Sequence, residues 1–240
     1  MSLPIKTLLF DFGGTLDADG TAWQERFYAH YKSVGLDMTP AMFASAFYAA
    51  DNPLVGTLAR DADLTKTVGR LTDNLEVEIA CRDGGMVNKR PNLDRVQHVA
   101  ALFLAEASAA FARNRPLLEA LAARYQLGIV SNFYGNLEAV CHGADLSPLF
   151  AVIVDSYRVG AQKPDPAIFR AALDPLRATP ETTLVVGDSL SRDRAGARRL
   201  GMGFVWIAPP GVQAAEAQAS REPINHLAVA RLVDLAEILM

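Results

Sequence analysis

The feature that most constrains the fold is a recurrence of short apolar segments rich in β-branched and aromatic residues. These segments lie at residues 7–12, 127–130, 150–154, 184–186 and 204–207. Most are followed by residues with the apolar period of a helix. Strands that alternate with helices pair in parallel, because each helix carries the chain back to the same edge of the sheet. The sequence therefore predicts an α/β fold with a parallel sheet covered by helices.

Residues 18–114 interrupt this alternation, since they show helical periodicity and no convincing strand. Thr21 and Gln24 have the spacing of a capping box, which predicts a first helix that ends at Gly35. Further helices are predicted to begin at Thr39 and Pro40, to run from Leu64 to a stop at Gly84 and Gly85, and to start again near Leu93. The segment therefore looks like an inserted helical domain.

Charge, apolar runs and cysteine spacing exclude several classes of protein. The formal net charge of −4 is spread along the chain without a basic stripe, so nucleic acid is not an expected partner. The sequence has neither a signal-peptide core nor an apolar run of membrane-spanning length, so a cytoplasmic protein is expected. Cys81 and Cys141 lack the spacing of a zinc site or a disulfide framework.

Two groups of side chains have an ordinary structural interpretation. The aromatic residues Phe43, Phe47 and Tyr48 are helically spaced, which favours packing in a core over lining a substrate pocket. The second group is a cluster of four arginines on a predicted helix, and such a cluster is typical of a solvent-exposed helix face. Its members are Arg192, Arg194, Arg198 and Arg199.

Polar groups follow several of the predicted strands, at the edge where open parallel sheets bind ligands. Asp11 ends the first strand in LLFDFGGTLD, and Ser131 and Asn132 end the second in IVSNF. In VGAQKPDPAIF, Lys163 precedes Asp165, a predicted helix N-cap. A lysine beside a helix N-terminus is poorly placed for the helix dipole, and an anionic ligand would explain it.

Two more carboxylates, Asp188 and Asp193, follow the fourth strand in LVVGDSLSRDRAGARRLG. If both lie near Asp11, the three side chains repel one another unless a cation sits among them. Hard oxygen ligands together with a phosphate favour magnesium.

Together these four segments resemble, in order and spacing, the motifs of the haloacid-dehalogenase-like hydrolase superfamily. The resemblance implies a Rossmann-like catalytic core of residues 1–17 and 115–240, with an α-helical cap domain at residues 18–114. It implies that Asp11 is a nucleophile that forms an aspartyl phosphate on a small phosphorylated metabolite. It also implies a catalytic and phosphate-binding role for Lys163, phosphate binding by Ser131 and Asn132, and Mg²⁺ ligands from Asp11, the Gly13 carbonyl, Asp188 and, through water, Asp193.

One position departs from the family pattern. Phosphatases of this superfamily usually carry a general acid and base two residues after the nucleophile, where this chain has Gly13. Such a group contributes about 10²- to 10⁴-fold in rate. A phosphatase is still expected, either acting on acyl, aryl or anomeric phosphates, which are good leaving groups, or borrowing an acid from Asp17, Asp19 or the cap.

Two alternatives remain open. In the first alternative, the chain is a catalytically impaired member of the superfamily that binds phosphate and Mg²⁺. In the second, it is an enzyme that cleaves carbon–halogen or carbon–phosphorus bonds. The retained Asp188 counts against a dehalogenase, because such relatives tend to lack the matching carboxylate. The sequence leaves the substrate and the oligomeric state undetermined.

Overall fold

A computed structural model describes residues 4–82, 92–208 and 226–240. Its centre is a six-stranded sheet with the order β3-β2-β1-β4-β5-β6, and every neighbouring pair is parallel. The strands are β1 (Thr7–Phe10), β2 (Gln126–Ser131), β3 (Val152–Asp155), β4 (Thr183–Gly187), β5 (Gly203–Ile207) and β6 (His226–Val229). The parallel sheet predicted from the sequence is confirmed.

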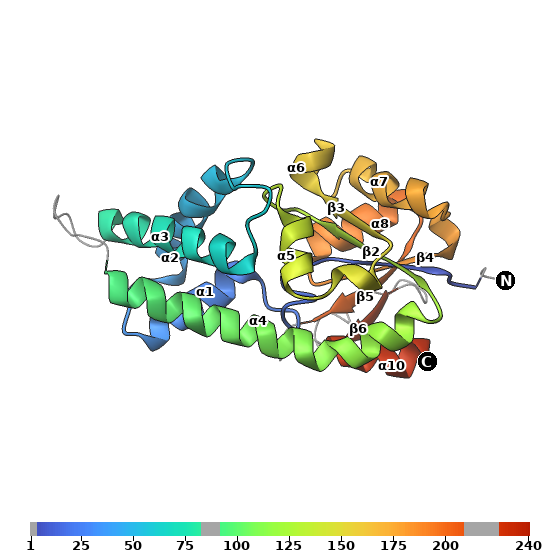
Figure 1. The fold of residues 1–240 in the computed structure, drawn as a ribbon, viewed down its shortest axis with the longest axis horizontal. Helices are drawn as coiled ribbons and strands as arrows, with labels where there is room; N and C mark the ends of the chain where they lie inside the picture. The colour runs from blue at the N-terminus through green and yellow to red at the C-terminus, as the bar shows by residue number, and fades with distance from the viewer. Residues whose placement is uncertain (1–3, 83–91, 209–225) are drawn as a thin grey trace.

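Helices cover both faces of the sheet (Figure 1). Alternate side chains of the strands pack against these helices in two apolar layers. Leu8 and Phe10 belong to the layer covered by α4 (Leu93–Ala122) and α5 (Leu137–Gly143). Leu9 points to the opposite layer, covered by α7 (Pro166–Leu176) and α8 (Ala195–Leu200). Because successive side chains of a strand point to opposite faces, both faces of the sheet are buried, as is usual for parallel sheets.

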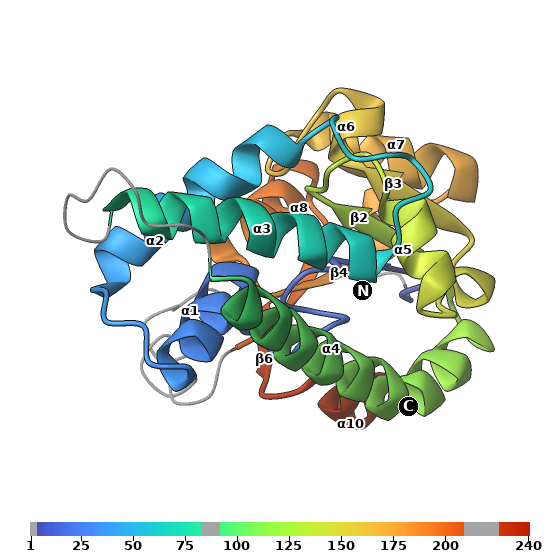
Figure 2. The same ribbon diagram turned by 60° about the vertical axis from the view of Figure 1, so that its left-hand side comes forward.

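Three further helices lie with α4 to one side of the sheet, as Figures 1 and 2 show. They are α1 (Trp23–Ser33), α2 (Pro40–Asp51) and α3 (Leu64–Arg82). The long helix α4 runs from this group to the sheet, so one rigid element belongs to both. No helix among the described residues combines the length and the apolar character needed to cross a bilayer.

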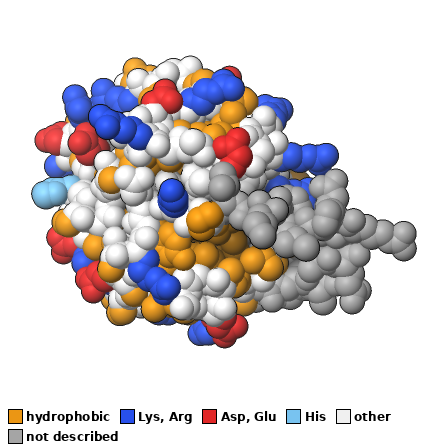
Figure 3. Space-filling model, turned by 90° about the vertical axis from the view of Figure 1, so that its right-hand side faces the viewer, with side chains coloured by type: hydrophobic (Ala, Val, Ile, Leu, Met, Phe, Trp, Pro, Cys, Tyr) orange, Lys and Arg blue, Asp and Glu red, His pale blue; other side chains and the backbone are white. Residues whose placement is uncertain are grey.

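Shorter elements complete the chain. They are η1 (Asn52–Leu54), η2 (Ser147–Leu149), α6 (Ser156–Val159), η3 (Pro180–Thr182), η4 (Leu190–Arg194), η5 (Leu232–Leu235) and α10 (Ala236–Leu239). On the face shown in Figure 3, acidic and basic side chains are interspersed.

Local capping agrees with the sequence at two helices and disagrees at one. The Thr39 side chain accepts a hydrogen bond from the Met42 amide, and Asp165 accepts one from Ala167, as N-caps do. The capping box predicted at Thr21 is wrong, because α1 starts one residue later, after Ala22, without a side-chain cap. The predicted stop at Gly84 and Gly85 lies outside the described residues.

Candidate active site

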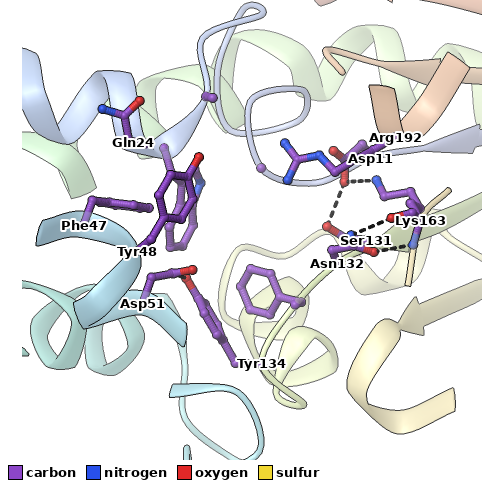
Figure 4. Close-up of a pocket in the computed structure, with 14 residues that line it drawn as sticks. Asp11, Gln24, Phe47, Tyr48, Asp51, Ser131, Asn132, Tyr134, Lys163 and Arg192 are labelled. Carbon is purple, nitrogen blue, oxygen red and sulfur yellow. Dashed lines mark hydrogen bonds and ion pairs between the residues drawn. The ribbon is translucent and has the colours of Figure 1, made fainter. Parts of the chain in front are cut away.

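Three donors converge on one oxygen of Asp11, at the carboxyl end of the central strand β1 (Figure 4). The Ser131 hydroxyl, at the end of β2, donates to Asp11 Oδ1 over 2.7 Å. The Lys163 ammonium lies 2.7 Å from the same atom, as does the Phe12 amide nitrogen. Parallel strands end at one edge of the sheet, so β1 and β2 bring residues together that are far apart in sequence.

The charges of Asp11 and Lys163 are mutually stabilised. Burial alone would raise the pKa of Asp11, but the Lys163 ammonium and the hydrogen bonds from Lys163 and Ser131 hold it below its ordinary value. Burial alone would lower the pKa of Lys163, but Asp11 and Asp193 hold it above its ordinary value. Both groups are therefore ionised at neutral pH, and Asp11 is available as a nucleophile.

Asn132 holds the Lys163 backbone in place. Its Oδ1 accepts a hydrogen bond of 2.7 Å from the Lys163 amide, and its Nδ2 donates to the Lys163 carbonyl over 3.2 Å. This reciprocal pair fixes the loop that carries Lys163. The resemblance implies phosphate binding by Asn132, and the contacts present show it positioning the lysine.

Asp193 lies in a single π-helical turn, η4, and has both carboxylate oxygens in use. Its Oδ1 is 2.7 Å from the Lys163 ammonium, and its Oδ2 accepts a 3.0 Å hydrogen bond from the Ser189 amide. A side chain engaged in this way is suited to orienting Lys163. The resemblance assigns it, in addition, as a metal ligand through water.

Three carboxylates gather beside β1 and β4. One oxygen each from Asp11, Asp188 and Asp193 lies within 4.8 Å of the others. Burial, and then repulsion from Asp11 and Asp193, raises the pKa of Asp188 well above its ordinary value, and burial raises that of Asp193 to about 6. Asp188 Oδ1 is buried without a hydrogen-bond partner. An orphaned oxygen among clustered carboxylates fits a hard divalent cation such as Mg²⁺.

The space beside Gly13 is occupied by Trp23. A Cβ atom at position 13 would lie 3.1 Å from the indole nitrogen of Trp23 and 3.3 Å from its Cδ1. The indole is held in turn by a 2.7 Å hydrogen bond to Asp17. The position at which relatives carry a general acid is thus covered by an aromatic ring.

Asp17 and Asp19 are already engaged elsewhere, so the hypothesis that either replaces the missing acid is wrong. Asp17 is fully buried and accepts hydrogen bonds of 2.7 Å from the Gly14 amide, Trp23 and Arg26. Asp19 pairs with Arg113 at 2.7 Å and accepts a hydrogen bond from the Leu232 amide. Neither side chain lines the pocket next to Asp11.

A pocket of about 130 Å³ opens in front of Asp11, between the sheet edge and the helices α1 and α2. The wall on the sheet side carries Asp11, Ser131, Asn132, Lys163 and Arg192. Helices α1 and α2 contribute Trp23, Gln24, Phe47, Tyr48 and Asp51, and the loop after β2 contributes Phe133 and Tyr134.

Several of these lining residues were missed or misread in the sequence. Arg192 was interpreted as part of a solvated face, but it borders the pocket. Phe47 is buried as the core interpretation requires, yet it also lines the pocket, as does the half-exposed Tyr48. Asp51 belongs to no motif, and no signal in the sequence marks it as a pocket residue. The Tyr134 hydroxyl donates a hydrogen bond to it.

Known proteins resemble this chain along its length. A family model described as haloacid dehalogenase-like hydrolase matches residues 5–201. Haloacid dehalogenase-like hydrolase domain-containing protein 3 of Danio rerio is 27% identical over 209 residues, which cover 84% of each chain. Its counterpart in Bos taurus is 39% identical over 85 residues, so that match spans 35% of this chain and only 34% of the bovine protein.

Two further similarities concern a phosphatase and a solved structure. A phosphoserine phosphatase of Thermus thermophilus is 38% identical over 97 residues, or 40% of this chain and 38% of that protein. The magnesium-bound HAD-hydrolase YfnB of Bacillus subtilis has a TM-score of 0.57 and 21% identity, with 99% of each chain covered, and so shares the fold. Because the family match spans most of the sequence and the site retains the expected groups, this chain belongs to the haloacid dehalogenase-like hydrolase family.

Proposed function

We propose that this chain is a magnesium-dependent phosphatase that transfers the phosphoryl group of a small phosphorylated metabolite to Asp11. The observation that carries the proposal is the convergence of the Ser131 hydroxyl and the Lys163 ammonium on one oxygen of a buried Asp11. Such donors suit a transferring phosphoryl group, whose negative charge they stabilise. The similarity to a phosphoserine phosphatase supports this class of reaction.

The reaction takes place in two displacements. In the first, a carboxylate oxygen of Asp11 attacks phosphorus, the bond to the ester oxygen breaks, and the leaving group departs with the electron pair. Ser131 and Lys163 donate to the phosphoryl oxygens during this step. In the second, water attacks phosphorus, inorganic phosphate leaves, and the Asp11 carboxylate is restored. Splitting the transfer in this way replaces one difficult step with two easier ones.

The carboxylates beside β1 and β4 would hold the metal ion. We assign Asp11, Asp188 and the Gly13 carbonyl as its direct ligands and Asp193 as a ligand through water. When bound, Mg²⁺ supplies positive charge between an anionic nucleophile and an anionic substrate. The helices α1 and α2, which belong to the expected cap domain, close the pocket on the side away from the sheet.

A burst experiment tests the proposal. The purified chain is mixed with 4-nitrophenyl phosphate, with Mg²⁺ or with a chelator, and nitrophenolate is followed in the first turnover. We expect a Mg²⁺-dependent burst equal to the enzyme concentration, followed by slow turnover, because Gly13 cannot activate the hydrolytic water. The variant Asp11→Asn should show neither phase. Absence of product from this ester and from acetyl phosphate would refute the proposal and favour an impaired, ligand-binding member.

A further inference from the structure

The wall of the pocket that faces Asp11 is aromatic. Trp23, Phe47, Tyr48, Phe133 and Tyr134 all line it. The Trp23 and Phe133 rings meet edge to face, with centroids 5.9 Å apart, and Trp23 lies 6.3 Å from Tyr134. Aromatic side chains in such arrangements form a preorganised surface for another ring.

This surface is rigid where it approaches the reacting groups. Trp23 is only 9% exposed, packs against Phe103 with centroids 5.0 Å apart, and is tied to Asp17 by its indole N–H. Tyr48, in contrast, is 53% exposed and forms the open rim of the pocket. The pocket volume of about 130 Å³ is small, which favours a compact organic group such as a single ring.

The chemistry of the site points the same way. Position 13 carries no carboxylate, and neither Asp17 nor Asp19 lines the pocket. A leaving group that is stable as an anion is therefore favoured. A phenolate spreads that charge over its ring, whereas an alkoxide cannot. Acyl and anomeric phosphates also leave readily, but they do not use an aromatic wall.

We infer that the substrate is an aryl phosphate, the phosphate monoester of a phenol with a single ring, stacked between Trp23 and Tyr48. The inference rests on the proposed phosphoryl transfer at Asp11. It adds the substrate class and assigns Trp23 and Tyr48 as the residues that select it.

Binding tests the inference without requiring turnover. Benzylphosphonate replaces the ester oxygen of phenyl phosphate with a methylene group, and cyclohexylmethylphosphonate is its saturated counterpart of similar size. Titration calorimetry with the wild-type chain and Mg²⁺ should show roughly two- to tenfold tighter binding of the aromatic compound, the range expected for ring stacking. Equal affinities, or tighter binding of the saturated ring, would overturn the inference.

Tyr48 provides a matched pair of variants, because its exposed ring can be removed with little effect on the core. Tyr48→Ala should reduce the preference for the aromatic phosphonate at least twofold, while Tyr48→Phe, which keeps the ring, should preserve it. Identical preferences in the two variants would remove Tyr48 from the proposed role.

Turnover separates this inference from the function on which it rests. We expect kcat/KM for phenyl phosphates to exceed that for cyclohexyl phosphate and to rise with the acidity of the phenol, since Gly13 offers no acid to the leaving group. If acetyl and cyclohexyl phosphates react and phenyl phosphates are disfavoured, the substrate class is wrong but the phosphatase stands. If no ester or acyl phosphate reacts, the phosphatase itself is wrong.

Discussion

At the scale of single residues, the missing carboxylate at position 13 is accompanied by a large side chain, Trp23, packed against that position. Gly13 leaves the room that the Trp23 indole fills, and the Asp17 hydrogen bond keeps the indole there. The two residues form a steric pair. From the sequence alone, an aspartate restored at position 13 is expected to speed turnover, but a Cβ atom 3.1 Å from a buried ring must displace it first.

We therefore predict that Gly13→Asp alone does not accelerate turnover and lowers the free energy of unfolding by about 1–3 kcal/mol, as overpacking does. The double variant Gly13→Asp with Trp23→Leu has space for the new carboxylate and should hydrolyse the phosphorylated Asp11 faster than Trp23→Leu alone. Single-turnover kinetics of phosphate release give the comparison. A gain in the single variant would show that Trp23 moves freely.

Asp188 shows the effect of unbalanced charge. Its buried carboxylate faces Asp11 and Asp193, and one of its oxygens has no hydrogen-bond partner. Such a group destabilises the fold until a cation binds, and a ligand that binds only the folded state then stabilises it by mass action.

We predict that Mg²⁺ raises the melting temperature of the wild-type chain and does not raise that of Asp188→Asn. In a chelator, Asp188→Asn should be at least as stable as the wild type, because the repulsion is gone. Thermal unfolding with and without Mg²⁺ measures both effects. Equal Mg²⁺ responses would place the metal ion away from Asp188.

At the scale of elements, a buried ion pair joins α1 to the loop after β1. Arg26, on α1, is 2% exposed, lies 2.7 Å from Asp17, and stacks over the Phe103 ring of α4 at 3.9 Å. Three segments distant in sequence thus share one guanidinium. Asp17 in turn anchors Trp23, so this contact supports the aromatic wall of the pocket.

Removing the arginine should leave the Asp17 charge buried and unpaired. We predict that Arg26→Met lowers the free energy of unfolding by about 3–5 kcal/mol. Arg60→Met is the matched control, since its 3.5 Å pair with Glu138 is exposed to solvent and should contribute less than about 1 kcal/mol. Urea unfolding of both variants gives the comparison. Similar losses of unfolding free energy would show that the buried ion pair contributes no more to stability than an exposed one.

At the scale of the whole molecule, the pocket exists because α2 lies across from the sheet edge. The Tyr134 hydroxyl, in the loop after β2, donates a hydrogen bond to Asp51 at the end of α2. This bond links the helix to the carboxyl edge of the sheet. Burial raises the pKa of Asp51 above 3.8, although the Tyr134 hydrogen bond and the Arg192 charge oppose the shift. The proton is therefore bound more tightly in the folded state than in the unfolded one.

This shift fixes the sign of a pH effect. A carboxyl whose pKa is raised on folding lowers the free energy of unfolding as pH rises above its unfolded pKa. We predict that Asp51→Asn, which keeps an acceptor for Tyr134, is more stable than the wild type at pH 7, and that the gap narrows toward pH 4. Urea unfolding from pH 4 to 8 measures the gap. A stability difference between the two proteins that grows toward acidic pH would show that folding lowers the pKa of Asp51 instead of raising it.

The sequence by itself determined the parallel sheet and the place of its chemistry. Strand length, apolar alternation and capping are local, and parallel strands end at one edge, so Asp11, Ser131 and Asp188 could be placed together before any coordinates. The structure confirms that arrangement at the ends of β1, β2 and β4.

The tertiary structure alone decided what faces this edge. Helical spacing shows that Tyr48 or Arg192 lies on a given side of a helix, but not which surface that side meets. Nor does helical spacing show that the Asp17 carboxylate accepts hydrogen bonds from Arg26 and Trp23. These contacts depend on how α1 and α2 pack against segments that are distant in the sequence. Such packing is a property of the assembled surfaces, and no local sequence pattern encodes it.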